Sequence, residues 1–260
     1  MTLLAVAVCY PFVWAIFASL KFDQDLMRFP PRLLADRYTI NQYVAVFTRI
    51  PFARFFVNTI IFAGIVSGIS ILFDSMAGYA FARLRFIGRR QLFVVVLITM
   101  FVPFQVIMIP LFIEVYRLGI LNTYAGLILP HCTSPFGIYL MRSFFVGLPK
   151  DLEESARIDG LNEFGVYRRI MLPLCMPALI TLFIFHFMFN WNDLLYPLMM
   201  TSSTTMRTLP SGLAMFIGER VIEYGPTLAA SILALLPLAI AYVFAQRYFV
   251  RSVAMTGLKG

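Results

Sequence analysis

The segment Asp151–Pro173 reads DLEESARIDGLNEFGVYRRIMLP, and it is the one long polar stretch in the second half of an otherwise apolar chain. Asp151 is predicted to cap a first short helix, with Glu154 as its capping-box partner, and Gly160 supplies the left-handed residue that ends this helix. Asn162 is predicted to cap a second helix that has one apolar and one basic face. Two short polar helices beside apolar spans indicate a docking surface. The second helix carries Phe164, Tyr167 and Met171 on its apolar face and Arg168 and Arg169 on the other.

The composition places the chain in a membrane. Of its 260 residues, 60% are hydrophobic and 13% are charged, and the mean hydropathy is +0.83. Charged residues approach a quarter of an ordinary water-soluble domain, so this chain is predicted to be a polytopic membrane protein. The net charge of +8 comes from short basic groups between apolar spans, which suit juxtamembrane anchoring and predict no nucleic-acid partner.

Windows of about 20 apolar residues, the length that crosses a bilayer, predict six spans. We expect an all-α transmembrane bundle in one domain, residues 1–260, with a cytoplasmic coupling loop at 142–172. The first span is taken as a transmembrane helix because no basic residue precedes it and no small-x-small cleavage pattern follows it. The predicted spans are approximately 2–20, 58–82, 92–113, 124–141, 172–190 and 227–248.

Basic residues orient these spans. Dense basic groups follow the second span, mark the polar segment after residue 142 and recur in the C-terminal tail, which predicts that these parts are cytoplasmic. The segment 21–57 also carries six basic residues, and nothing basic precedes the first span, which favours the opposite orientation. That segment is long and also contains acidic residues, so the orientation is assigned from the basic residues of the shorter loops. Both termini are then predicted to be cytoplasmic.

Several residues inside the spans attract attention. Gly64 and Gly68 form a GxxxG pattern, which predicts close helix packing. Asp74 lies deep in the second span, and we expect a structural ion pair with Arg83 or Arg85 rather than a proton relay. Prolines are predicted to break spans three and four, which favours a pathway over a plain anchor. These prolines are Pro103, Pro110, Pro130 and Pro135. His131 and His186, each alone among apolar residues, are expected to be core histidines.

The fifth span ends in Asn190, Trp191, Asn192 and Asp193. Trp191 there is typical of an interfacial anchor, and the polar residues around it could instead line an extracytoplasmic vestibule. The segment that follows, up to about Pro226, is long enough to contact an external partner. It includes Glu219, Arg220 and Glu223.

Enzyme motifs are absent from the sequence. No phosphate loop, HExxH, GxSxG or dinucleotide-binding GxGxxG occurs, and Cys9, Cys132 and Cys175 form no CxxC pair. This chain is therefore not expected to be an enzyme or to bind ATP. A transport subunit driven by another protein, a self-sufficient transporter or channel, and a structural anchor remain. The cytoplasmic pair of helices favours the driven subunit, because that class needs a surface through which a motor acts.

The polar segment also contains a pattern of residues that is similar to a known family motif. Glu154, Ser155, Ala156, Gly160 and the run Ile170–Pro173 resemble the EAA loop of permease subunits in bacterial ABC importers, with Ser155 where the family usually has Ala. Further motifs are similar to the carbohydrate-importer branch, the class of the second maltose permease subunit. These motifs are Ser19–Lys21, Asn41, Tyr43, Asn58, Gly78–Arg83, Pro103, Pro110, Asn122–Thr123 and Trp191–Asn192.

The resemblance implies a type I importer fold in the bacterial cytoplasmic membrane. It implies a homologous sister permease, two cytoplasmic ATPase subunits that use ATP and Mg²⁺, and an extracytoplasmic solute-binding protein, with no cofactor on this chain. The solute would be a sugar or sugar-like molecule; the alternatives are a polyol or glycerol-phosphate-type solute, or a non-conducting scaffold for an ATPase. The ATPase-coupling residues would be Glu153, Glu154, Ser155, Ala156, Asp159 and Gly160, and the pathway candidates Asn190, Trp191, Asn192 and Asp193.

Overall fold

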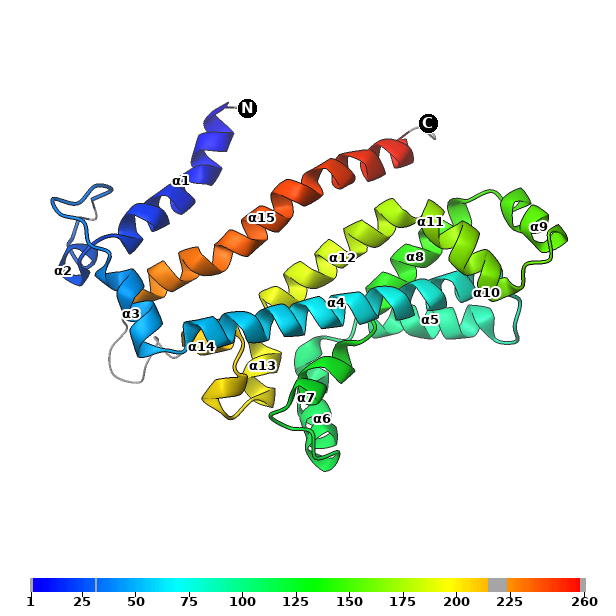
Figure 1. Cartoon of the computed structure of the whole chain (residues 1–260), viewed down its shortest axis with the longest axis horizontal. Helices are drawn as coiled ribbons and strands as arrows, with labels where there is room; N and C mark the ends of the chain where they lie inside the picture. Colours follow the sequence, from blue (N-terminus) through cyan, green and yellow to red (C-terminus); the bar gives the residue numbers. More distant parts are fainter. Residues whose placement is uncertain (1, 31, 215–223, 258–260) are drawn as a thin grey trace. The chain divides into compact units, whose positions relative to one another are not determined.

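The computed structural model describes residues 2–30, 32–214 and 224–257, and within these residues the chain contains helices and no strands (Figure 1). The chain forms two compact units, which are described separately. The first unit combines Met1–Thr59 with Asp193–Ala241. The second combines Ile60–Asn192 with Tyr242–Gly260. The predicted all-α fold class is confirmed for the described part of the chain.

Polar side chains connect the segments of the first unit. The Asn58 amide donates to the carbonyl oxygens of Thr205 and Arg207, both at 2.8 Å. The hydroxyls of Ser19 and Tyr43 lie 2.8 Å apart. Buried backbone carbonyls need such donors, so these residues stabilise the fold of this unit. Its helices are α1 (Thr2–Ser19), α2 (Asp23–Leu26), α3 (Asn41–Arg49), the start of α4 (Phe52–Arg83), α13 (Leu195–Met200), η3 (Thr204–Met206), α14 (Leu209–Leu213) and the first part of α15 (Tyr224–Gly257).

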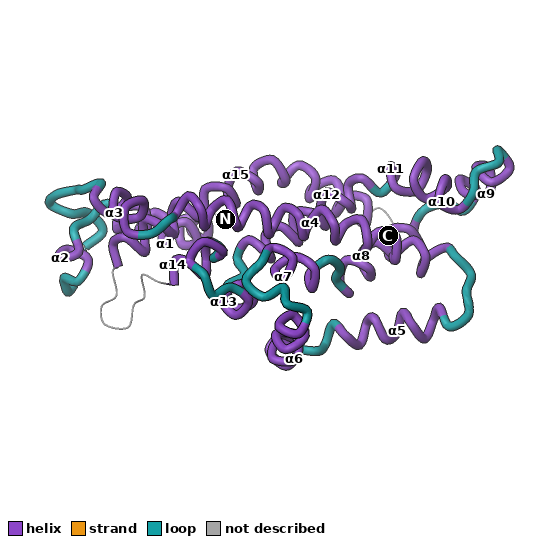
Figure 2. Tube along the Cα trace, turned by 60° about the horizontal axis from the view of Figure 1, so that its bottom comes forward, coloured by secondary structure: helices purple, strands orange, loops and turns teal. Residues whose placement is uncertain are grey.

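The second unit has a core in which α4, α8, α12 and the polar segment pack together. Phe145, Met141, Met171 and Leu182 are completely buried there. Figure 2 shows the loop between α4 and α5 and the break between α5 and α6. The further helices of this unit are α5 (Arg89–Thr99), α6 (Phe104–Arg117), α7 (Tyr124–Ile128), η1 (Leu129–His131), α8 (Pro135–Gly147), α9 (Asp151–Ile158), α10 (Glu163–Val166), the π-turn η2 (Tyr167–Met171), α11 (Leu172–Leu174) and α12 (Met176–Trp191).

Helix length supports part of the span prediction. Among the described residues, α4 is the one helix that is long and apolar enough to cross a membrane unaided. Two helix pairs pass the same criterion together but are bent, by 101° between α5 and α6 and by 79° between Glu163–Leu174 and α12. Counting each pair as one span gives up to three such spans in the described part. The number six is therefore not confirmed.

Three of the four prolines predicted to interrupt spans three and four lie at helix boundaries. Pro103 immediately precedes α6, and Pro110 lies within it. In the fourth predicted span, Pro130 lies in η1 and Pro135 is the first residue of α8. A proline has no amide hydrogen to donate, so a helix readily begins at it and is interrupted before it. The predicted interruptions at Pro103, Pro130 and Pro135 are confirmed, whereas α6 continues through Pro110 without a break.

Close helix packing involves glycines other than the predicted GxxxG pair. A Cβ atom added at Gly64 or Gly68 would have no atom within 4 Å, so the predicted packing role is wrong within the described chain. A Cβ at Gly78 would lie 2.7 Å from Cβ of Met141, and one at Gly137 would lie 1.9 Å from a carboxylate oxygen of Asp74. Contact of α4 with α8 therefore requires glycine at positions 78 and 137. The spacing of glycines along the helix does not predict these two positions.

Candidate functional site: the coupling segment and a buried carboxylate

Local backbone chemistry forms the polar segment as two helical pieces. Helix α9 begins at Asp151 with Lys150 as the preceding cap residue, so the predicted role of Asp151 as the cap is wrong. Asp151 instead lies in the first turn with two glutamates, where negative charge favours the helix dipole. Gly160 follows with φ of 86°, as predicted, and Asn162 accepts a hydrogen bond from the Gly165 amide at 2.8 Å, which confirms the second cap.

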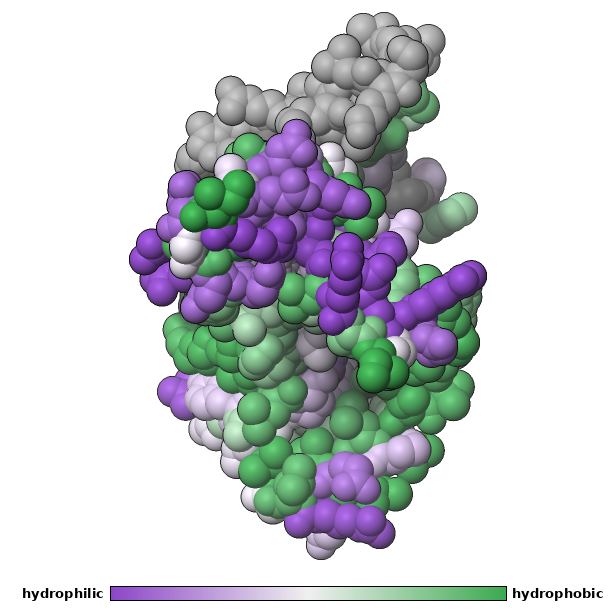
Figure 3. All heavy atoms as spheres, turned by 90° about the vertical axis from the view of Figure 1, so that its right-hand side faces the viewer, coloured by the Kyte–Doolittle hydropathy of each residue, from purple (hydrophilic) through white to green (hydrophobic). Residues whose placement is uncertain are grey.

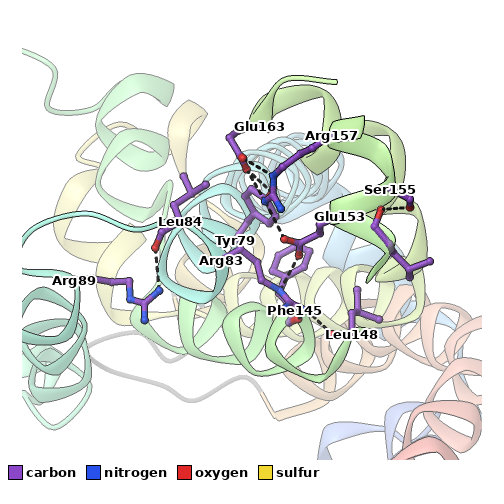
Figure 4. A network of polar contacts seen from close by, with 11 residues as sticks. Tyr79, Arg83, Leu84, Arg89, Phe145, Leu148, Glu153, Ser155, Arg157 and Glu163 are labelled. Atoms are coloured by element: carbon purple, nitrogen blue, oxygen red, sulfur yellow. Dashed lines mark hydrogen bonds and ion pairs between the residues drawn. The ribbon is translucent and has the colours of Figure 1, made fainter. Parts of the chain in front are cut away.

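An ion pair fixes α9 to the end of α4. Nε of Arg83 lies 2.9 Å from Oε1 of Glu153, and each of these side chains is 5% exposed (Figure 4). The same guanidinium donates to the carbonyl oxygens of Phe145 and Leu148 at the end of α8. Charged groups are rarely buried without such partners. One arginine therefore joins the ends of α4, α8 and α9.

A second arginine connects α9 to α10. Arg157 Nη2 lies 3.2 Å from Glu153, and Nε of Arg157 lies 2.8 Å from Glu163, which also accepts a hydrogen bond from the Tyr79 hydroxyl at 3.1 Å. The hydrogen bond from Arg157 lowers the pKa of the Glu163 carboxyl below its ordinary value, and Glu163 in turn raises the pKa of Arg157. Arg157 therefore favours the ionised form of Glu163, and its contacts with both glutamates hold the two short helices as one body.

The predicted coupling residues divide into two groups. Glu153 and Ala156 are buried against the second unit, whereas Glu154, Ser155, Asp159 and Gly160 are exposed. Exposed apolar side chains accompany the exposed group: Leu152 is 39%, Phe164 58% and Ile158 86% exposed. Figure 3, which views the end of Figure 1 where α9 and α10 lie, shows hydrophilic side chains gathered on this face with hydrophobic ones among them. Such a mixed patch is typical of a protein interface.

Asp74 is the centre of a second polar cluster in the second unit. Its carboxylate is completely buried and accepts hydrogen bonds from the Thr133 hydroxyl at 2.7 Å and the Ser134 amide at 2.9 Å. Nε2 of His186 lies 3.0 Å from its other oxygen. The expected pairing with Arg83 or Arg85 is wrong. Arg83 pairs with Glu153, and Asp74 lies about two and a half helical turns earlier, next to the break before α8. The cluster brings together residues that are far apart in the sequence. The one sequence feature that pointed to a buried polar site was a carboxylate, Asp74, within an apolar span.

His131 and His186 differ in their surroundings. The His131 ring packs against Phe62 and Phe104, with ring centroids at 6.0 and 6.3 Å, as a core histidine does. His186 is the Asp74 partner and lies on the wall of an apolar cavity of about 380 Å³. Within the described part of the chain, no group of three or more His, Cys, Asp or Glu side chains could hold a metal ion.

The four predicted pathway residues make local contacts. Asn190 and Trp191 are buried, the Asn190 amide donates to the His186 carbonyl at 2.7 Å, and Trp191 stacks on Phe187. The burial of Trp191 contradicts a role as an exposed interfacial anchor in this chain. Asn192 is exposed and donates to the Met188 carbonyl, and Asp193, in the first unit, accepts from the Tyr196 amide. Glu219, Arg220 and Glu223 of the predicted external surface lie outside the described residues.

Broken apolar helices with a polar helical segment ion-paired to their ends are the arrangement expected of a membrane transport subunit. Residues 74–255 match the family described as "Binding-protein-dependent transport system inner membrane component". The chain belongs to this family of inner-membrane ABC permease components.

Relatives extend the match to almost the whole chain. The arabinooligosaccharide transport permease AraQ of Halalkalibacterium halodurans is 36% identical over 99% of this chain and 93% of its own length. The trehalose/maltose transport permease MalG of Thermococcus litoralis is 33% identical over 99% of this chain and 94% of its own length. A solved bacterial ABC transporter that imports the polysaccharide alginate superimposes with a TM-score of 0.86 at 23% identity, covering 95% of this chain and 93% of its own. The structural similarity to the alginate transporter shows that this chain has the same fold.

Proposed function

We propose that this chain is the sugar-translocating permease subunit of an ATP-driven importer and that a separate ATPase acts on it through α9. The proposal rests on the set of contacts that Arg83 makes with Glu153 of α9 and with the end of α8, which is called the Arg83 clamp below. The inner face of α9 is ion-paired to α4 and hydrogen-bonded through Arg83 to α8, while its outer face presents Glu154 and Ile158 to the surroundings. A force applied to the outer face would therefore reach the apolar helices.

The solute class rests on the relatives. The names of three of them refer to arabinooligosaccharides, to trehalose and maltose, and to sulfoquinovosyl glycerol. We infer a sugar or a sugar conjugate for this chain as well. No observation favours the polyol, the glycerol-phosphate ester or the scaffold role over it.

The proposal includes the assembly and the topology. The permease would pair with a homologous sister subunit, two ATPase subunits and an extracytoplasmic binding protein, and a solved relative by fold is described in complex with a periplasmic protein that carries an alginate pentasaccharide. Residues 1–260 would act as one domain with six spans and with both termini in the cytoplasm. ATP and Mg²⁺ would bind the ATPase, and this chain would bind no cofactor.

The mechanism follows from the clamp. Closure of the ATPase dimer on ATP would move α9 and α10 as one body, because Arg157 holds them together through Glu153 and Glu163. The Arg83 ion pair would carry this motion into α4 and α8 and shift the population between inward-open and outward-open states. Glu154, Ser155, Asp159 and Gly160 would contact the ATPase, and Glu153 and Ala156 would hold α9 in place from within. Asn190, Trp191, Asn192 and Asp193 stay pathway candidates.

The test is a charge reversal on the outer face. Glu154→Arg should weaken co-purification of the ATPase and lower solute uptake, because Glu154 is exposed and makes no ion pair within the described residues. Arg90→Glu, an equally exposed charge reversal in α5 and outside α9, is the matched control and should leave both unchanged. Unchanged association and uptake in Glu154→Arg would count against coupling through α9.

A further inference from the structure

A cleft of about 750 Å³ lies between the α4–α5 loop and α9, in the second unit. Among its lining residues are Arg83, Glu153, Arg157 and Glu163, whose charges are already paired with one another. Arg85, Arg89 and Lys150 also line it. Within the described residues these three cations have no carboxylate partner, and the one further acidic group on the wall is Glu154. The cleft therefore carries an excess of positive charge.

The cationic wall continues into an apolar helix. Arg89 is the first residue of α5, and no residue of α5 is buried. Leu92 and Val95, one and two turns beyond Arg89, are 52% and 55% exposed. Ile87, at the tip of the loop that enters α5, is fully exposed at 101% of its reference surface. In a membrane component, exposed apolar side chains directly beside arginines are typical of the lipid interface.

We propose that this cleft binds the phosphate of an anionic phospholipid of the cytoplasmic leaflet. Arg85, Arg89 and Lys150 contact the headgroup, and the acyl chains lie along Leu92 and Val95 of α5. A phospholipid combines a phosphate with apolar chains, so it complements both the cationic wall and the apolar helix; an acidic protein segment complements the wall alone. The site rests on the membrane placement in the proposed function but not on the solute or on the ATPase contact.

Lipid in this cleft would affect coupling. Glu153 and Glu154 of α9 lie on the same wall as Lys150. A bound headgroup therefore touches the body that the ATPase is proposed to move, and its phosphate neutralises cations that would otherwise repel one another. Anionic lipid is thus expected to stabilise the position of α9.

The test measures lipid bound to the assembled transporter. The complex is equilibrated in nanodiscs with equal amounts of phosphatidylglycerol and phosphatidylcholine and extracted, and retained lipids are counted by native mass spectrometry. Arg85→Gln with Lys150→Gln removes two cleft cations that are exposed and make no hydrogen bond among the described residues, so insertion should persist. Retention of phosphatidylglycerol should fall about 30-fold, since each basic residue near an anionic surface contributes roughly fivefold.

The matched control is Arg90→Gln with Arg168→Gln, which removes two exposed cations on the same predicted side of the membrane but outside the cleft. It should retain lipid as the unmodified protein does. Arg85→Lys with Lys150→Arg keeps the charge and should also retain it. Equal retention in the Gln pair and in its control overturns the site. Loss of ATPase association without loss of lipid in the Gln pair overturns it too, because the occupant is then the ATPase. Solute uptake, measured separately, tests the proposed function alone.

Discussion

The guanidinium of Arg83 and the carboxylate of Glu153 lie 2.9 Å apart, and each side chain is 5% exposed. Arg83 is the last residue of α4, and Glu153 lies in the first turn of α9. The arginine also donates hydrogen bonds to two carbonyl oxygens at the end of α8. Because the pair is buried, neither group has water as an alternative partner. The rigidity of the coupling segment therefore depends on one ion pair more than on the helical propensity of its short pieces.

Glu153→Gln is predicted to destabilise the permease strongly. Removing one partner of a buried pair typically costs about 3–5 kcal/mol, because the other charge stays buried. Thermal unfolding of the purified complex in detergent measures the loss. Glu154→Gln is the control: it changes a neighbouring exposed carboxylate and should alter stability by less than about 0.5 kcal/mol. Similar effects of the two substitutions would contradict the clamp.

Gly160→Val is predicted to abolish uptake while membrane insertion continues. The φ of 86° at Gly160 is a conformation that β-branched residues avoid, and a left-handed residue costs about 1–2 kcal/mol in general. Gly160→Asn should retain more uptake, since Asn tolerates this conformation best among side-chain residues. No added Cβ would meet another atom at this position, so the difference tests backbone conformation rather than crowding. Equal uptake by the Val and Asn variants would show that the left-handed turn is unimportant.

Asp74→Ala is predicted to loosen the start of α8. One carboxylate oxygen of Asp74 accepts from both the Thr133 hydroxyl and the Ser134 amide, and alanine offers no acceptor in its place. Each buried donor left without an acceptor costs about 1–3 kcal/mol. Hydrogen exchange at the Ser134 amide should accelerate, and the unfolding temperature should fall. Asp159→Ala, which removes an exposed carboxylate, serves as the control, and unchanged exchange at Ser134 in Asp74→Ala would argue against the cluster.

Gly137→Ala and Gly64→Ala are predicted to differ sharply. A methyl group at Gly137 would lie 1.9 Å from an oxygen of Asp74, whereas one at Gly64 would meet nothing within 4 Å. Overpacking of this kind typically costs about 1–3 kcal/mol, so the Gly137 variant should show lower yield and a lower unfolding temperature. Gly64→Ala should match the unmodified protein in both measurements, and a large effect there would indicate a contact that this chain alone does not make.

Short-range features were predictable because their causes are local. Gly160 and Asn162 end and begin helices through backbone conformation and capping, which depend on residues within a few positions. Prolines interrupt helices for an equally local reason. The EAA resemblance predicted a coupling role for the polar segment Asp151–Pro173, and that role stays a prediction. Capping chemistry assigned Asp151 the wrong position, because Asp and Lys are adjacent at a boundary that varies by a residue.

The amino-acid sequence was enough to predict an all-α membrane protein, the positions of its interrupted spans and of its polar segment, and the family that it resembles. The interaction partners became known only from the folded structure. In it Glu153 pairs with Arg83, and Asp74 contacts His186 and the segment before α8. Close helix packing occurs at Gly78 and Gly137. These contacts join residues far apart in the chain, and their energies depend on burial and on which donors meet a carboxylate in three dimensions. Helical spacing and hydropathy carry no information about such encounters.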